Sequence, residues 1–187
     1  MPATHTKRLL TAYAIGDATS KDVIEWATTM LIDGHDTPHL CMLAGYSESQ
    51  AESNLEEFRA DFRRTLKELG LELPPERTAY EDHACFICEA ILDGAISFRK
   101  GHRILYSIWQ EVNYGIGGAQ IFEPFMYLED SLSLVEEGYP PLMERFTGLN
   151  EETYQNILRN EARLFIDAHC KPEQNKSCEA TGDNVPN

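Results

Sequence analysis

Residues 47–69, SESQAESNLEEFRADFRRTLKEL, form the longest periodic stretch of this chain. Its apolar side chains recur at intervals of three and four residues, at Leu55, Phe58, Phe62, Leu66 and Leu69. That spacing places them on one face of an α-helix and leaves the charged residues on the opposite face. Gly70 follows as a helix stop. The pattern therefore predicts a long amphipathic helix that packs against a core.

The same periodicity continues on both sides of this stretch and predicts further helices. The expected ranges are 6–15, 20–33, 38–45, 76–92, 104–112, 122–137 and 150–166. Between them, residues 96–101 are expected to form a short basic turn, and residues 113–120 a loop with three glycines. Short connections favour antiparallel neighbours. The sequence thus predicts an all-α fold, a single-domain bundle of about seven to nine helices over residues 1–170.

The last residues of the chain differ in composition from the rest. From Lys171 onward the sequence is polar, with a single valine and no aromatic residue. Such a segment cannot bury enough apolar surface to offset the entropy lost on ordering. Residues 171–187 are therefore expected to form a disordered tail.

Composition also restricts where the protein works. The sequence has no run of 18 apolar residues, and its first residues lack the apolar core of a secretory signal. The five cysteines are an odd set without a framework spacing, as expected for unpaired thiols in a reducing compartment. These features predict a cytoplasmic protein that does not cross a membrane.

The net charge of −15 is concentrated in two stretches that contain no Lys or Arg. One lies between Lys21 and Arg59, and the other between Arg103 and Arg145. Solvated helix faces are the usual explanation of such runs, whereas a docking surface for a basic partner is the functional alternative. The residues expected to contact such a partner are Asp33, Asp36, Glu48, Glu52, Glu56, Glu129, Asp130, Glu136 and Glu137. The acidity argues against nucleic acid as a partner.

Two groups of residues carry the elements of a metal site. His83, Cys85 and Cys88 form an H-x-C-x-x-C cluster, and His35 and His39 are four residues apart. On a helix, His83 points away from the two cysteines, and Pro38 places the two histidines across a helix start. Buried cysteines and loop histidines are therefore the favoured interpretation. No catalytic residue, metal or cofactor is predicted, because the sequence contains neither a P-loop nor a nucleophile elbow.

A resemblance is carried by residues 22–45, DVIEWATTMLIDGHDTPHLCMLAG. The matching features are Trp26-Ala27, Gly34, Asp36-Thr37, Leu40 and Leu43-Ala44-Gly45. This pattern resembles a helix–turn–helix seen in small bacterial proteins, including immunity proteins of polymorphic-toxin and contact-dependent inhibition systems. The resemblance implies a helical binding protein and designates no catalytic residue.

These observations predict an acidic, cytoplasmic binding protein that neutralises a basic protein partner, such as a nuclease toxin. Tyr46 and Tyr139 are candidate exposed anchors for that contact. The protein is expected to act as a monomer or homodimer. Two alternatives remain open: a small helical metal-dependent hydrolase and a helical regulatory adaptor.

Overall fold

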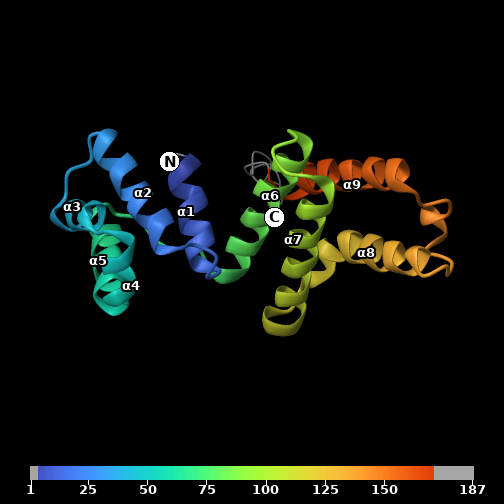
Figure 1. Ribbon diagram of the computed structural model, residues 1–187, viewed down its shortest axis with the longest axis horizontal. Coiled ribbons are helices and arrows are strands. Elements are labelled where there is room, and N and C mark those ends of the chain that lie inside the picture. Colours follow the sequence, from blue (N-terminus) through green and yellow to red (C-terminus); the bar gives the residue numbers. More distant parts are fainter. Residues whose placement is uncertain (1–3, 171–187) are drawn as a thin grey trace, which may run out of the picture. The chain divides into compact units, whose positions relative to one another are not determined.

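The computed structural model describes residues 4–170, and throughout this range the regular structure is helical (Figure 1). The α-helices are α1 Thr4–Ala14, α2 Ser20–Ile32, α3 Pro38–Gly45, α4 Glu48–Ser53, α5 Leu55–Glu68, α6 Glu76–Leu92, α7 Phe98–Glu111, α8 Glu123–Glu136 and α9 Glu151–Phe165. Single π turns follow α7 and α9 (η1 Val112–Ile116 and η4 Ile166–Cys170), and 3₁₀ turns precede α8 and α9 (η2 Ala119–Phe122 and η3 Glu144–Phe146). The all-α prediction is confirmed. The predicted tail, residues 171–187, lies outside the described residues.

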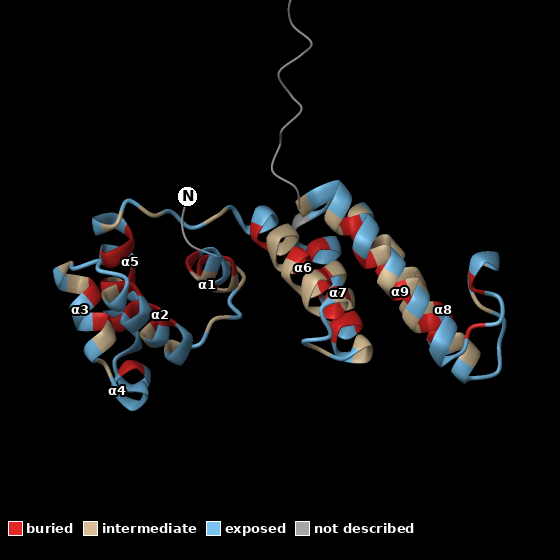
Figure 2. Cartoon of the chain, turned by 90° about the horizontal axis from the view of Figure 1, so that it is seen from above, coloured by how far each residue is buried: buried red, intermediate tan, exposed pale blue. Residues whose placement is uncertain are grey.

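The helices form two compact units, residues 1–83 and residues 84–187, and the division falls within α6. We call them the N-terminal unit and the C-terminal unit. The sequence predicts a single domain over residues 1–170. Each unit has buried residues of its own, shown in red in Figure 2, and the single domain stays a prediction.

The N-terminal unit buries an apolar stripe of α2 against its neighbours. Val23, Trp26 and Met30 are buried on this stripe, as their spacing predicts. The Trp26 ring meets Phe62 of α5 edge-on, with ring centroids 5.7 Å apart. Its indole N–H donates to the Thr6 hydroxyl of α1 at 3.1 Å. Trp26 therefore connects three helices through apolar contact and a satisfied polar group.

The helix predicted over residues 47–69 is divided into α4 and α5. Ser47 caps α4 in a capping box with Gln50, and α4 ends after one and a half turns. The break falls at Asn54, whose backbone (φ −123°, ψ 45°) is not helical. Leu55 consequently begins a new helix and is partly exposed, while Phe58, Phe62 and Leu66 keep the predicted buried face. The periodic apolar residues begin at Leu55, so they gave no information on the segment before it, where the break falls.

The basic segment predicted as a turn is the first turn of α7. The Ser97 hydroxyl accepts a hydrogen bond from the Lys100 N–H, a typical N-cap that starts the helix at Phe98. Gly101 is buried on the next turn, and a Cβ there would lie 2.4 Å from Cγ1 of Ile91 on α6. The glycine allows α7 to approach α6 closely. The predicted glycine loop that follows contains η1 and the start of η2.

A disulfide joins Cys85 of α6 to Cys170 at the end of η4, within the C-terminal unit. The prediction of unpaired cysteines is wrong for this pair. The two residues are 85 positions apart in the sequence, so only the tertiary fold brings their sulfur atoms together. Cys88, one turn further along α6, is a buried free thiol, and burial raises its pKa to about 12. Cys41 is free and exposed.

Candidate functional site

The acidic residues predicted to contact a partner from the N-terminal unit all lie exposed on its surface. Asp33 and Asp36 follow the C-terminal end of α2. Glu48 and Glu52 are four residues apart on α4 and share a face, and Glu56 lies in the first turn of α5. All five carboxylates are therefore accessible to a partner.

Neighbouring cations neutralise these carboxylates only in part. Arg59 pairs with Glu56 at 3.3 Å, and His5 lies 3.8 Å from Asp33. In both pairs the side chains are largely exposed, so each contributes little stability. Within the described part of the chain, no cationic side chain pairs with Glu48 or Glu52. These five carboxylates consequently retain most of their negative charge.

Large apolar side chains lie exposed within the same Lys- and Arg-free stretch. Ile32, at the end of α2, is 79% exposed, and Met42 of α3 is 48% exposed. Ile32 directly precedes Asp33, so an apolar side chain and a carboxylate are adjacent on the surface. Apolar groups at the centre of a contact and charges at its rim are typical of protein interfaces. We call Ile32, Asp33, Asp36 and Met42, at the end of α2 and on α3, the acidic–apolar surface.

The four predicted acidic residues of the C-terminal unit have different surroundings. Glu129 and Glu136 contact nitrogen groups of their own unit: Glu129 lies 3.0 Å from the His102 imidazole, and Glu136 lies 3.3 Å from the Arg99 guanidinium. Asp130 is half-buried, and burial raises its pKa although Tyr106 donates a hydrogen bond to it. Glu137 is exposed at the end of α8. Of this group, the structure therefore leaves Glu137 as the most accessible carboxylate.

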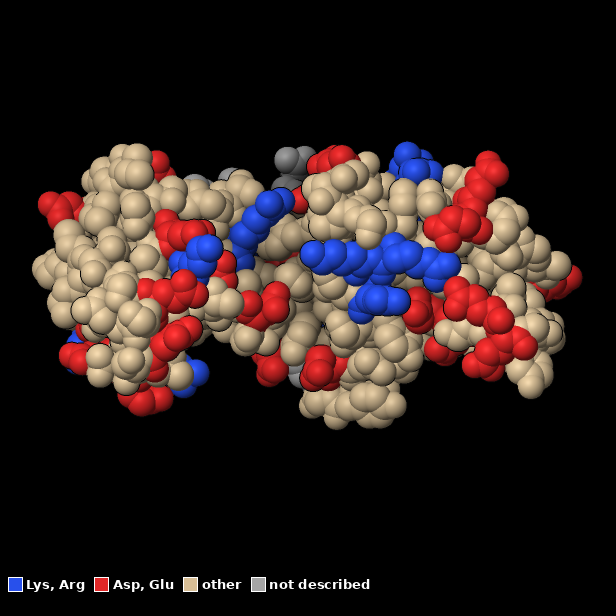
Figure 3. All heavy atoms as spheres, in the orientation of Figure 1, with Lys and Arg blue, Asp and Glu red and all other residues tan. Residues whose placement is uncertain are grey.

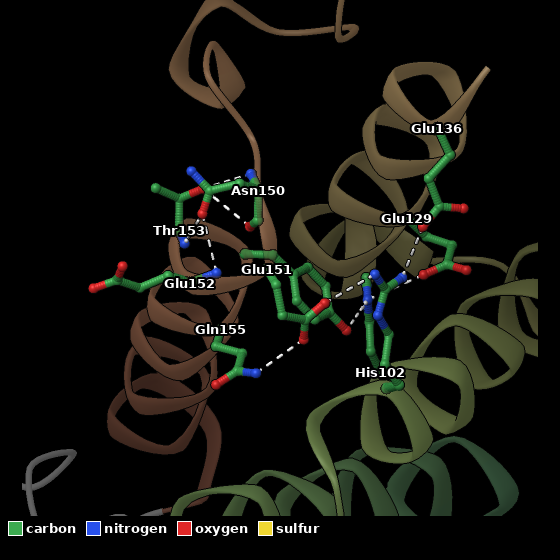
Figure 4. A network of polar contacts seen from close by, with 10 residues as sticks. His102, Glu129, Glu136, Asn150, Glu151, Glu152, Thr153 and Gln155 are labelled. Carbon is green, nitrogen blue, oxygen red and sulfur yellow. Dashed lines mark hydrogen bonds and ion pairs between the residues drawn. The ribbon is translucent and has the colours of Figure 1, made fainter. Parts of the chain in front are cut away.

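A buried polar network in the C-terminal unit was not predicted from the sequence (Figure 4). His102 of α7 is fully buried (0% exposed). Its Nε2–H donates to the backbone carbonyl of Phe125 on α8 at 2.8 Å, while Nδ1 lies 3.1 Å from the Tyr154 hydroxyl of α9. Arg99 lies over the Tyr154 ring and donates to Glu151 at 3.1 Å. The network ties α7, α8 and α9 together.

The electrostatics of this network favour a neutral imidazole. Burial lowers the pKa of His102, whereas the Glu129 carboxylate acts in the opposite direction. Burial also raises the pKa of Tyr154, so its hydroxyl keeps its proton and can donate to Nδ1. The signal that could have found His102 is its spacing from Leu105 and Ile108, which places it on the buried stripe of α7.

A second buried polar group, Asp61 of α5, was also missed. Its carboxylate accepts hydrogen bonds from the Tyr46 hydroxyl at 3.0 Å and from Arg64 at 2.9 Å. Tyr46 is half-buried, with its ring edge-on to Phe58, and does not form the exposed anchor that the sequence suggested. Tyr139 is 60% exposed, as an anchor requires.

Several of the histidines and cysteines considered as metal ligands have other partners. His39 pairs with Glu68 at 2.5 Å, a contact that lowers the pKa of Glu68, and His35 is exposed. His83 lies 3.9 Å from Asp17, and burial lowers its pKa. In residues 4–170, no three His, Cys, Asp or Glu side chains gather in a way that could hold a metal ion.

Two further findings concern membrane-spanning helices and similarity to known proteins. Each helix in residues 4–170 is too short or too polar to span a bilayer. Comparison of the chain with protein-family models, with curated proteins and with solved structures finds no match.

Proposed function

We propose that this protein binds a basic protein partner through the acidic–apolar surface of its N-terminal unit. The observation that carries the proposal is the exposure of Ile32, at 79%, directly beside Asp33 and in a stretch without Lys or Arg. An exposed apolar side chain beside a carboxylate fits the apolar centre and charged rim of a protein contact. Carboxylates around it would direct a cationic protein to that point and repel anionic competitors.

Neutralisation of a bacterial toxin, such as a basic nuclease, is the specific form of this function that we favour. The helix–turn–helix of residues 22–45, on which the resemblance to immunity proteins rests, includes Ile32, Asp33 and Asp36 of this surface. A nuclease carries a cationic groove for the phosphate backbone. A rigid helical surface that presents carboxylates and an apolar anchor could occlude such a groove.

The test is direct binding to the product of a neighbouring reading frame that encodes a basic protein. The two purified proteins are mixed, and binding is measured by surface plasmon resonance at several salt concentrations. We expect a 1:1 complex whose association rate falls as salt rises. The Ile32→Ser variant should dissociate faster, because it loses the apolar anchor. The double variant Asp33→Asn and Asp36→Asn should associate more slowly, because it loses the attraction to a basic protein.

The matched control is Glu137→Gln, which removes an exposed carboxylate from the C-terminal unit. It should bind like the unaltered protein. Equal losses in the control and in the double variant Asp33→Asn and Asp36→Asn would overturn the assignment to the acidic–apolar surface. A candidate partner that binds Ile32→Ser as tightly as the unaltered protein would do the same.

The compartment forms a separate part of the proposal. The sequence predicts the cytoplasm, whereas the Cys85–Cys170 disulfide favours an oxidising compartment. We propose the cytoplasm, with Cys85 and Cys170 reduced there. Thiol alkylation of the protein in intact cells of its native host tests this: both cysteines should be labelled, and a protected pair would place the protein elsewhere.

A further inference from the structure

A cavity of ≈ 370 Å³ opens between α1, α2 and α5 of the N-terminal unit. Its walls include the apolar side chains of Tyr13, Val23, Leu55 and Phe58. Val23 and Phe58 belong to the buried core, so the floor of the cavity is rigid and apolar. The walls combine these apolar side chains with polar ones, and the volume suits a small molecule.

Two arginines of α5 line the same cavity. Arg59 and Arg63 are four residues apart, so they project from one face of the helix. Arg59 has an exposed ion pair with Glu56 at 3.3 Å, which a stronger anion can replace at little cost. In the part of the chain that the structure describes, no carboxylate lies within ion-pair distance of Arg63. Two guanidinium groups are therefore available to an anion, and their fork geometry suits carboxylate or phosphate.

Hydroxyl groups at the start of α2 line the opposite side. The Thr19 hydroxyl is occupied, because it donates to the Asp22 carboxylate within the capping box. The Ser20 hydroxyl lines the cavity in the first turn of this 13-residue helix, where the helix dipole favours negative charge. Carboxylates close in sequence to the lining residues are those of Asp17, Asp22, Glu56, Glu57 and Asp61, and none of these residues lines the cavity.

We infer that this cavity binds a small amphipathic anion, a carboxylate or phosphate attached to an aromatic or aliphatic body. The apolar body would occupy the floor formed by Val23 and Phe58. The anionic group would lie between the two arginines and Ser20. This site is separate from the acidic–apolar surface, and it goes beyond the proposed binding of a protein partner.

The overall charge of −15 does not prevent this binding. At physiological ionic strength, charges more than about 8 Å away are largely screened. The two arginines lie closest to a bound anion, and Glu56, 3.3 Å from Arg59, is the nearby carboxylate that the anion has to displace. The distant carboxylates slow the approach of an anion more than they weaken its final contact.

The inference is tested by isothermal titration calorimetry of the full chain with four probes. Phenyl phosphate and phenylacetate combine an anion with an apolar body, whereas inorganic phosphate lacks the body and 2-phenylethanol lacks the charge. We expect measurable binding for at least one of the first pair, and at least ten-fold weaker binding for the other two probes. The tighter member of the first pair identifies the natural anion as a phosphate or a carboxylate.

Variants locate the site. Arg63→Gln should weaken binding of the preferred probe at least ten-fold, and NMR shifts induced by the probe should include the Ser20 amide. Lys67→Gln is the matched control, since it removes a cation from the same helix outside the cavity. Both substitutions are at exposed positions, and circular dichroism checks that both proteins fold. Equal effects of the two substitutions, or equal affinity for 2-phenylethanol, would overturn the inference.

Discussion

The buried faces of the two units differ in chemistry. In the N-terminal unit, apolar side chains such as Trp26 and Phe62 dominate, and the buried Asp61 is held by Tyr46 and Arg64. In the C-terminal unit, the neutral His102 lies among three helices, and a disulfide joins Cys85 to Cys170. The free energy gained from apolar burial depends only weakly on pH and on redox conditions. A histidine, by contrast, changes its protonation with pH, and a disulfide is broken by reduction. Stability of the two units should therefore depend on different conditions.

The chain contains a reporter for each side of this comparison. It has two tryptophans, Trp26 in the N-terminal unit and Trp109 in the C-terminal unit. A Trp109→Phe background reports the first unit by fluorescence, and a Trp26→Phe background reports the second. Each prediction below is measured as a urea transition in both backgrounds.

The largest effect is expected from Phe62→Ala. Phe62 is fully buried and contacts the rings of Tyr13 and Trp26. Its removal should lower the free energy of unfolding of the N-terminal unit by about 3–5 kcal/mol through lost burial and an unfilled cavity. The urea midpoint of the C-terminal unit, reported by Trp109, should not change. An equal shift of both transitions would show that the two units unfold as one domain, as the sequence predicts.

Loss of the disulfide should give the next largest effect, confined to the other unit. Cys170→Ser releases a loop closed over 85 residues and should destabilise the C-terminal unit by roughly 2–4 kcal/mol. Cys41→Ser, at an exposed free thiol, is the control and should change neither transition. A reducing agent should reproduce the effect of Cys170→Ser. If Cys170→Ser and Cys41→Ser behave alike, the disulfide does not stabilise this unit.

Acidification should distinguish the units by a smaller amount. Burial lowers the pKa of His102 in the folded protein, while the unfolded chain takes up the proton at about 6.5. Stability from the neutral form is therefore complete above pH 6.5 and is lost below it, at up to about 1.4 kcal/mol per pH unit. The Trp109 transition should weaken between pH 7.5 and 5.5, and His102→Gln should flatten this dependence. If acidification instead moves the Trp109 transition to higher urea concentration, the Glu129 carboxylate holds a proton on Nδ1 of His102 in the folded protein.

The smallest expected effects are at the helix caps, and they should be similar in the two units. Thr19 caps α2 and Asn150 caps α9, each in a capping box. Alanine at either position should cost about 1 kcal/mol in its own unit, because backbone N–H groups lose their acceptor. Ser133→Ala, at an exposed position inside α8, controls for loss of a hydroxyl alone. A loss in the opposite unit would contradict the division at α6.

The sequence alone determined the fold class and most of the helices. Periodic apolar residues, caps and glycine stops are local signals, so α2, α3, α6 and α9 lie close to where they are predicted. The acidic residues of the N-terminal unit are exposed, as the polar side of an amphipathic pattern requires. Ile32 was assigned to no surface, because a single apolar residue at a helix end carries no periodic signal.

Only the tertiary structure decided which distant residues meet. It joined Cys85 to Cys170, paired Glu129 with buried His102, and enclosed a cavity beside Arg59 and Arg63. Such contacts depend on how helices pack and not on spacing along the chain. Local pattern specifies which face of a helix is buried, whereas the partner of each side chain is set by the geometry of the packed helices.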